Sequence, residues 1–225
     1  MITSRRLGLL GGTFDPIHYG HLDAAEAAKA ALSLDEVLLI PACDPQHRAS
    51  DPCATAFHRF ALASLAVDGR SGYRVSDMEL VRQGPSYTSD TLRALHNEGW
   101  NASQLFFILG ADAFSEIATW HEFPAVLDAA HFVVIARPGT TIEAAIARTP
   151  DLRVRACLAS EMGPIGTTRT GTRIVLVEAR TRNVSSTMVR QRLAARNPIV
   201  DLLPPAVARH IFAHHLYGAV GDLHG

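Results

Sequence analysis

The sequence predicts an α/β protein with a parallel β-sheet covered by helices on both faces. Short apolar runs alternate along the chain with segments of helical periodicity, and this alternation is typical of strand-helix-strand units. A glycine-rich turn follows the first apolar run and precedes an alanine-rich segment, so it marks a junction between a buried strand and a helix. The chain has 225 residues, of which 48% are hydrophobic and 19% charged. This is enough for one core of ordinary size, and we expect a single domain over residues 1–225.

The first part of the chain shows a regular series of elements. Short apolar runs predict strands over 6–10, 37–40, 73–76, 105–109 and 132–136. Between them, apolar residues that recur with helical spacing predict helices over 18–32, 57–67, 89–96 and 111–118. The result is a doubly wound, Rossmann-like parallel sheet, and ligands of such sheets gather at the carboxyl ends of the strands.

The pattern loosens after residue 138, and a helical C-terminal region follows. Proline at a first helical position and serine at an N-cap are the signals that place its helices. The expected elements are a short helix over 140–147, a mobile loop within 163–171, a strand over 174–177, a helix to about 196 capped by Ser185 or Ser186, and a last helix opened by Pro204 and Pro205 that runs through 216.

Composition and charge exclude several classes of protein. The formal net charge is -1, whereas nucleic-acid-binding domains usually carry a marked basic excess, so we expect no nucleic-acid partner. The apolar run after Arg5 and Arg6 is broken by glycines, and no stretch reaches membrane-spanning length. We therefore expect no signal peptide, no membrane partner and a cytoplasmic location. The three cysteines form no CxxC pair and are expected to be free thiols. The sequence leaves open whether the protein forms a homo-oligomer.

Residues 11–22 carry the strongest functional signal. They read GGTFDPIHYGHL at the point where the first strand turns into the first helix. The N–H groups of a helix's first turn have no intrahelical partner and carry roughly half a positive charge, so they attract an anion. Gly11 and Gly12 let the backbone approach a ligand closely, and His18 and His21, three residues apart, face the same side. The segment therefore predicts a phosphate-binding site.

A second candidate is the segment 185–190, which reads SSTMVR. A hydroxyl-rich helix start offers side-chain oxygens, free amides and a positive dipole end, and Arg190 returns to the same helix face. By itself the segment also fits an ordinary N-cap followed by a surface arginine. Its occurrence beside the first motif favours a role in phosphate binding.

Both motifs resemble those of a known superfamily. Residues 12–21 match the GxFxPxHxGH signature of the nucleotidyltransferases related to class I aminoacyl-tRNA synthetases, and residues 185–190 resemble their S-S/T-x-x-R element. Those enzymes join the α-phosphorus of a nucleotide to a phosphate nucleophile. The resemblance implies that His18, His21 and Arg190 are catalytic. It further implies that ATP is bound by Gly11, Gly12, Thr13, Phe14, Gly20, Gly110, Asp112, Arg137, Ser185, Ser186 and Thr187.

Four further segments resemble the bacterial nicotinate-mononucleotide adenylyltransferases within that superfamily. They are PACDPQHR at 41–48, PSYTSDTL at 85–92, GAD at 110–112 followed by Trp120, and RPG at 137–139. Ala42 and Gln46 depart from the family's PNxxPPHK/R loop, whereas His47 and Arg48 keep its cationic end. The resemblance implies an acceptor site formed by Asp15, His47, Arg48, Tyr87, Thr88, Trp120 and His121.

The resemblance thus implies an enzyme that transfers the adenylyl group of ATP to nicotinate mononucleotide. The products would be nicotinate adenine dinucleotide and pyrophosphate, on the route to NAD. Mg²⁺ would be bound mainly by the ATP phosphates, and no metal site of the protein itself is expected. His210, His214 and His215 lack a further ligand and are assigned no role.

Two alternatives remain at this stage. One is another adenylyltransferase of the superfamily, such as the phosphopantetheine enzyme, against which the PSYT segment and Trp120 argue. The other is a catalytically silent nucleotide-binding protein, against which the intact His18, His21 and Arg190 argue.

Overall fold

Seven parallel strands form one sheet at the centre of the part of the chain that the computed structural model describes, residues 5–46, 51–82, 84–136, 139–162 and 171–220. The strand order is β3-β2-β1-β4-β5-β7-β6. The fold class predicted from the sequence is confirmed. The strands are β1 (Leu7–Gly12), β2 (Glu36–Pro41), β3 (Tyr73–Val75), β4 (Leu105–Gly110), β5 (His131–Ala136), β6 (Ala156–Leu158) and β7 (Ile174–Glu178).

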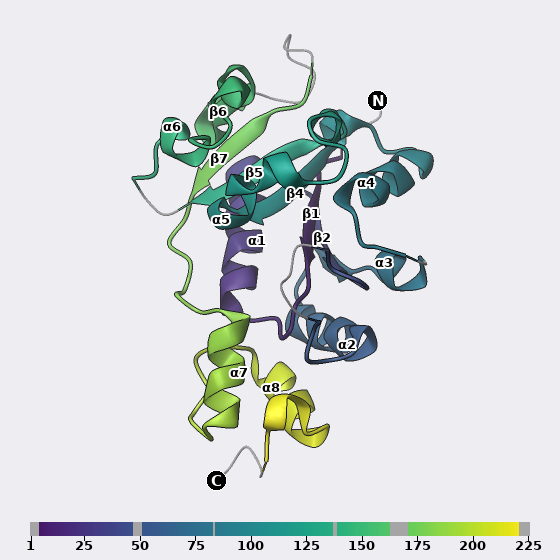
Figure 1. Ribbon diagram of the computed structural model, residues 1–225, viewed down its shortest axis with the longest axis vertical. Coiled ribbons are helices and arrows are strands. Elements are labelled where there is room, and N and C mark those ends of the chain that lie inside the picture. The colour runs from purple at the N-terminus through teal and green to yellow at the C-terminus, as the bar shows by residue number, and fades with distance from the viewer. Residues whose placement is uncertain (1–4, 47–50, 83, 137–138, 163–170, 221–225) are drawn as a thin grey trace.

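Helices cover both faces of this sheet (Figure 1). Successive strand residues point to opposite faces, so Leu38 joins one buried cluster and Leu39 the other. One face packs against α1 (Tyr19–Leu32) and α2 (Ala56–Val67), and α7 (Ser186–Ala194) and α8 (Pro205–Ala213) extend the same buried cluster beyond the edge of the sheet (Figure 1). The opposite face packs against α4 (Thr88–Asn97), α5 (Ala111–Ser115) and α6 (Ile142–Ala145). Among the described residues, no helix combines the length and the apolar character that crossing a membrane requires.

The order of the strands places the ligand-binding edge between β1 and β4. From β1 the chain adds β2 and β3 on one side and then returns to pair β4 with the other side of β1. At such a reversal the connecting helices diverge to opposite faces and leave a crevice beyond the carboxyl ends of the strands. The turn at residues 13–18 follows β1, and Gly110 ends β4, so both border this crevice.

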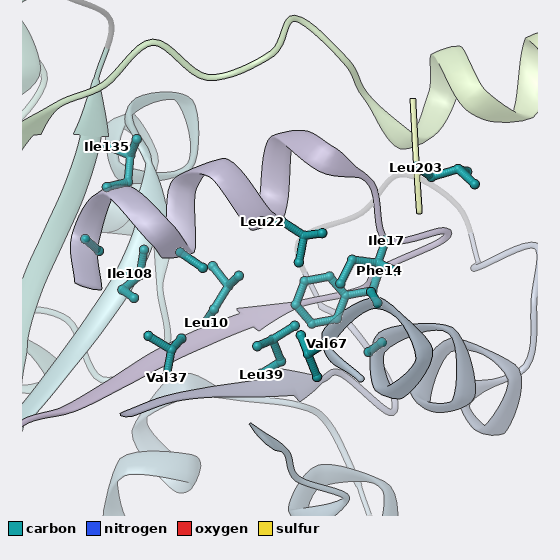
Figure 2. Packing of buried hydrophobic residues seen from close by; sticks show 14 of the residues in the cluster. Leu10, Phe14, Ile17, Leu22, Val37, Leu39, Val67, Ile108, Ile135 and Leu203 are labelled. Carbon is teal, nitrogen blue, oxygen red and sulfur yellow. The ribbon is translucent and has the colours of Figure 1, made fainter. Parts of the chain in front are cut away.

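The turn after β1 is anchored by apolar packing. Phe14, with a positive φ of 52°, and Ile17 are both buried in the cluster on the α1 face. Figure 2 shows their side chains together, close to Leu22 of α1, with Leu203 beyond them. The turn therefore has a fixed shape before any ligand arrives.

Several boundaries differ from the sequence-based expectation. The expected helix over 111–118 ends at Ser115 and continues as a 3-10 turn at Ile117–Thr119, where hydroxyl groups bond to nearby carbonyls and compete with the helix. The last helix ends at Ala213 instead of residue 216. The left-handed backbone of His215, with a φ of 51°, prevents its continuation.

Two elements were missed. The short helix α3 (Met78–Val81) and the strand β6 escape sequence reasoning because both are too short to show a periodic pattern of apolar residues. The expected mobile loop within 163–171 lies outside the described residues except for Gly171. The single domain over residues 1–225 stays a prediction.

The difference in burial between two valines predicts different losses of stability when each is replaced by alanine. Val175, in β7, is fully buried, whereas Val154 is 80% exposed. Val175→Ala should lower the free energy of unfolding by about 2 kcal/mol through lost burial and a residual cavity. Val154→Ala, the matched control, should change it by less than about 0.5 kcal/mol. Urea denaturation of both variants measures the difference, and equal midpoints would contradict this assignment of the core.

Candidate active site at the carboxyl edge of the sheet

His18 and His21 lie together at the start of α1. His18 is the N-cap residue, and the two imidazole rings stack with their centroids 3.7 Å apart. The backbone N–H of His18 donates to Nδ1 of His21 at 3.2 Å. Because Nδ1 accepts, the neutral ring of His21 carries its proton on Nε2 and can donate it to a ligand. A Cβ on Gly20 would lie 3.1 Å from the His18 ring, so a larger residue there would require this ring to shift by a few tenths of an ångström.

Both histidines are neutral in the free protein. Burial lowers the pKa of His18 to about 4, although the carboxylate of Asp23 acts in the opposite direction. Burial and the neighbouring His18 hold the pKa of His21 well below its usual value. Within the described residues, Nδ1 of His18 is buried and makes no hydrogen bond. A buried nitrogen without a partner is costly, and a ligand atom that bonds to it would relieve this cost.

The glycines before Phe14 serve the packing of aromatic rings. A Cβ on Gly12 would lie 2.9 Å from the Phe14 ring, and one on Gly11 would lie 3.1 Å from the Phe107 ring. The side chain of Phe14 is buried, so a ligand could meet only its backbone. Thr13 follows Gly12 on the partly exposed side of the turn.

Asp15 is turned into the protein. Its side chain is 1% exposed, and its two carboxylate oxygens accept the backbone N–H groups of Cys53 and Ala54 at 2.9 and 3.0 Å. Nη1 of Arg190 lies 3.7 Å from the same carboxylate. The structure therefore shows Asp15 bracing the turn, and the acceptor-binding role expected from the sequence stays a prediction.

The start of α7 docks onto the turn between β1 and α1. Ser185 is the N-cap, because its side chain accepts the backbone N–H of Met188 at 3.1 Å. The hydroxyl of Ser186 donates to the carbonyl of Pro16 at 2.8 Å, and Nη1 of Arg190 donates to the carbonyl of Asp15 at 2.7 Å. The exposed hydroxyl of Thr187 accepts from Nη2 of Arg190 at 3.2 Å. Two segments far apart in the sequence thus form one site.

An ion pair holds the chain that leads into α7. Arg182 forms two bonds from its side chain to Asp23 of α1, at 2.7 and 3.0 Å. Its guanidinium also lies 3.8 Å from the ring centre of Tyr19. Because Tyr19 and Asp23 are both in the first part of α1, these contacts fix the two helix starts relative to each other.

Two of the residues expected around the acceptor, Tyr87 and His121, lie against each other. The rings of Tyr87 and His121 stack with centroids 4.2 Å apart, and the hydroxyl of Ser89 lies 3.1 Å from Nδ1 of His121. Trp120 meets the ring of Phe107 edge-on at 5.8 Å and is partly exposed. Thr88 begins α4, so its N–H belongs to the first turn, whose amides lack intrahelical acceptors.

Ser86 joins this group to the loop after β2. Its hydroxyl accepts the backbone N–H groups of Cys43 and Asp44 at 3.0 and 3.3 Å, and its own N–H donates to the carbonyl of Asp44 at 2.9 Å. The PSYT segment is therefore bonded to the start of the loop after β2, at Cys43 and Asp44.

The remaining expected residues divide into two groups. Gly110, the last residue of β4, is also the N-cap of α5. Asp112 is exposed in the first turn of that helix, at the edge of the crevice. His47, Arg48 and Arg137 lie outside the described residues, and their roles stay predictions.

Sequence reasoning missed Arg59, which is 1% exposed. Its side chain donates to the carbonyl of Thr13, in the turn after β1, and to that of Ala42, in the loop after β2. A signal was present, because Arg59 shares the buried face of α2 with Leu62, Ala63 and Ala66 at helical spacing. An arginine on an apolar stripe is unusual and indicates a specific set of buried partners.

Comparison with known proteins identifies relatives of this chain. Residues 9–192 match the family model described as Cytidylyltransferase-like. A protein of Roseiflexus sp. (strain RS-1) is 42% identical over 96% of this chain and 100% of its own length. A protein of Pseudomonas syringae pv. tomato is 41% identical over 96% of this chain and 95% of its own length. Both are named probable nicotinate-nucleotide adenylyltransferases.

Solved structures share the fold. A Plasmodium falciparum nicotinic acid mononucleotide adenylyltransferase complexed with NaAD superposes with a TM-score of 0.69 at 18% identity, covering 96% of this chain and 98% of that one. The same enzyme complexed with APC gives a TM-score of 0.66 with the same coverage. The family model and the two bacterial relatives span nearly the whole chain, and the chain belongs to the cytidylyltransferase-like family and, within it, to the nicotinate-nucleotide adenylyltransferases.

Proposed function

We propose that this protein transfers the adenylyl group of ATP to nicotinate mononucleotide, giving nicotinate adenine dinucleotide and pyrophosphate. The observation that carries the proposal is the stacked pair His18 and His21 beneath the docked start of α7. It occurs in a chain that is about 40% identical, over nearly its full length, to relatives named for this activity.

The reaction needs alignment and charge stabilisation more than a base. The phosphate monoester of the acceptor is largely dianionic at neutral pH, because its second pKa is about 6. One of its oxygens attacks the α-phosphorus of ATP, a new P–O bond forms, and the bond from the α-phosphorus to the bridging oxygen of pyrophosphate breaks. The Nε2–H of His21 donates to the α-phosphate, where negative charge increases in the transition state.

The β- and γ-phosphates lie at the start of α7 in this proposal. The first-turn amides of a helix are free donors at the positive end of its dipole. Arg190 has five N–H donors, and its contacts with the Asp15 carbonyl and Thr187 leave part of this fork for phosphate. The leaving pyrophosphate is therefore stabilised by a segment different from the one that holds the α-phosphate.

Mg²⁺ enters with ATP in the proposed reaction. Mg²⁺ prefers oxygen ligands and commonly binds through substrate phosphates, so the proposal assigns its ligands to the phosphate oxygens of the nucleotide. When bound, the ion neutralises part of the triphosphate charge. The cytoplasmic location and the oligomeric state stay predictions.

The acceptor site distinguishes a carboxylate from an amide in this proposal. Nicotinate and nicotinamide mononucleotide have nearly the same shape, so size cannot separate them. Backbone N–H groups near Thr88 and His121 can both donate to a carboxylate, whereas the NH₂ of an amide would meet a donor. The stacked Tyr87 and His121 rings and the partly exposed Trp120 support a proposed position of the pyridine ring beside them.

A pyrophosphate-release assay tests the proposed function. With ATP and Mg²⁺, nicotinate mononucleotide should be used with a kcat/KM roughly 30-fold to several thousand-fold above that of nicotinamide mononucleotide. This range follows from two mispaired buried donors at about 1 to 2.5 kcal/mol each. Phosphopantetheine should give no pyrophosphate. Equal kcat/KM values for the two mononucleotides would refute the preference, and no release with any of the three would refute the adenylyl transfer itself.

Replacement of His21 tests the donor to the α-phosphate. His21→Ala should lower kcat by about 10² to 10³, the usual loss for one transition-state donor, with a smaller change in KM for ATP. His214→Ala, at an exposed position after α8, is the control and should keep the activity. A rise in KM for ATP at unchanged kcat would show that His21 binds only the ground state.

The buried histidines also predict how stability depends on pH. The folded-state pKa of His18, about 4, lies below the unfolded value of 6.5, so the unfolded chain binds more protons between these values. The free energy of unfolding should therefore fall as pH falls from 6.5 to 4, by at most about 3 kcal/mol from His18. His131, whose pKa burial lowers to about 4, acts in the same direction.

Urea denaturation at several pH values measures this slope. His18→Asn should retain the contribution of His131 and lose that of His18, so its stability should fall less steeply over the same range. Identical slopes for the variant and the unmodified protein would mean that His18 is not held neutral by burial.

A further inference from the structure

Arg59 is a buried cation that donates hydrogen bonds to the carbonyls of two loops, the turn after β1 and the connection between β2 and α2. Its side chain is 1% exposed and lies near the start of α2. Nη1 donates to the carbonyls of Thr13 and Ala42 at 2.8 and 2.6 Å, Nη2 donates to Cys43 at 3.1 Å, and Nε donates to Ala54 at 3.2 Å. Five donors in a rigid plane allow one arginine to satisfy this many carbonyls.

Each of these carbonyls belongs to a segment with a place in the candidate site. Thr13 lies in the turn that leads to His18 and His21. Ala42 and Cys43 begin the loop after β2, which Ser86 ties to the segment containing Tyr87. Ala54 donates its own N–H to the buried carboxylate of Asp15. Arg59 therefore bonds at once to the ATP side and to the acceptor side of the site.

The helix that carries Arg59 is firmly held. Leu62, Ala63 and Ala66 of the same helix face are buried in the cluster on the α1 side of the sheet. The guanidinium thus projects from a rigid support into the space between the two loops. Besides Arg59, the Asp15 carboxylate joins these loops by accepting the N–H groups of Cys53 and Ala54, and the N–H of Ala42 donates to the carbonyl of Gly12 at 2.9 Å.

We propose that Arg59 is a positioning residue that sets the distance between the two bound nucleotides. This inference rests on the proposed adenylyl transfer. The acceptor oxygen must meet the α-phosphorus in line with the leaving group, so the relative placement of the two loops determines the rate. A displacement of about 1 Å at the reacting atoms can cost about 10²-fold in rate. The affinity for either nucleotide alone depends on one loop and is insensitive to this distance.

The test separates binding from rate. Arg59→Gln should lower kcat by about 10²-fold, while the Kd of ATP alone and of nicotinate mononucleotide alone, measured by calorimetry, each change by less than about 3-fold. Arg155→Gln is the matched control. Arg155 also connects separate segments, donating to the Leu127 carbonyl at 2.9 Å and to Asp128 and Thr172, but none of these lies in the site. It should lower the melting temperature and leave kcat within about 3-fold.

Arg59→Lys distinguishes positioning from charge. A lysine keeps the positive charge but concentrates its donors at one point, so it cannot bond to carbonyls on both loops in the same geometry. Its kcat should resemble that of Arg59→Gln, with a melting temperature closer to that of the unmodified protein. This variant also covers the case in which the glutamine variant fails to fold.

Three outcomes would overturn the inference. The first is full kcat in Arg59→Lys, which would leave only a role for charge. The second is a tenfold or larger loss of affinity for a single nucleotide at unchanged kcat. The third is an equal fall in kcat in Arg155→Gln. Failure of the unmodified protein to release pyrophosphate would instead refute the proposed function, so the two hypotheses fail separately.

Discussion

The burial of Phe14 and Ile17 is the constraint on which the rest of the site depends. These two side chains pull the turn after β1 into the core and leave its backbone at the edge of the sheet. The shape of the turn then determines where α1 begins, and with it the positions of His18 and His21. The start of α7 docks onto the carbonyls of Asp15 and Pro16 that this turn exposes. A hydrophobic contact thus organises a site whose chemistry is polar.

The polar groups of the site are arranged for an anion, although the two histidines are uncharged. Burial holds the pKa values of His18 and His21 low, so they act as neutral donors in the free protein. Positive character comes instead from the helix starts and from the guanidinium of Arg190. Such a site keeps its donors over a wide pH range, because it does not require the histidines to be protonated.

The two halves of the site are connected mainly through backbone groups. Asp15 accepts the amides of Cys53 and Ala54, Arg59 donates to carbonyls of both loops, and Ser86 joins the loop after β2 to the segment before α4. Backbone bonds of this kind depend little on which side chains the loops carry. The departures at Ala42 and Gln46 from the family's loop are compatible with this frame, since Ala42 contributes its carbonyl.

The sequence by itself determined the fold class and indicated a candidate phosphate-binding turn after the first strand. These are local or periodic signals, because glycines, capping residues and apolar spacing act over a few neighbouring residues. Only the tertiary structure decided that Ser185 is the N-cap, that Asp15 faces inward and that His121 stacks on Tyr87. It also revealed Arg59. Its partners lie 5 to 46 residues away along the chain, and contacts at such separations arise from the path of the folded backbone, which no local pattern records.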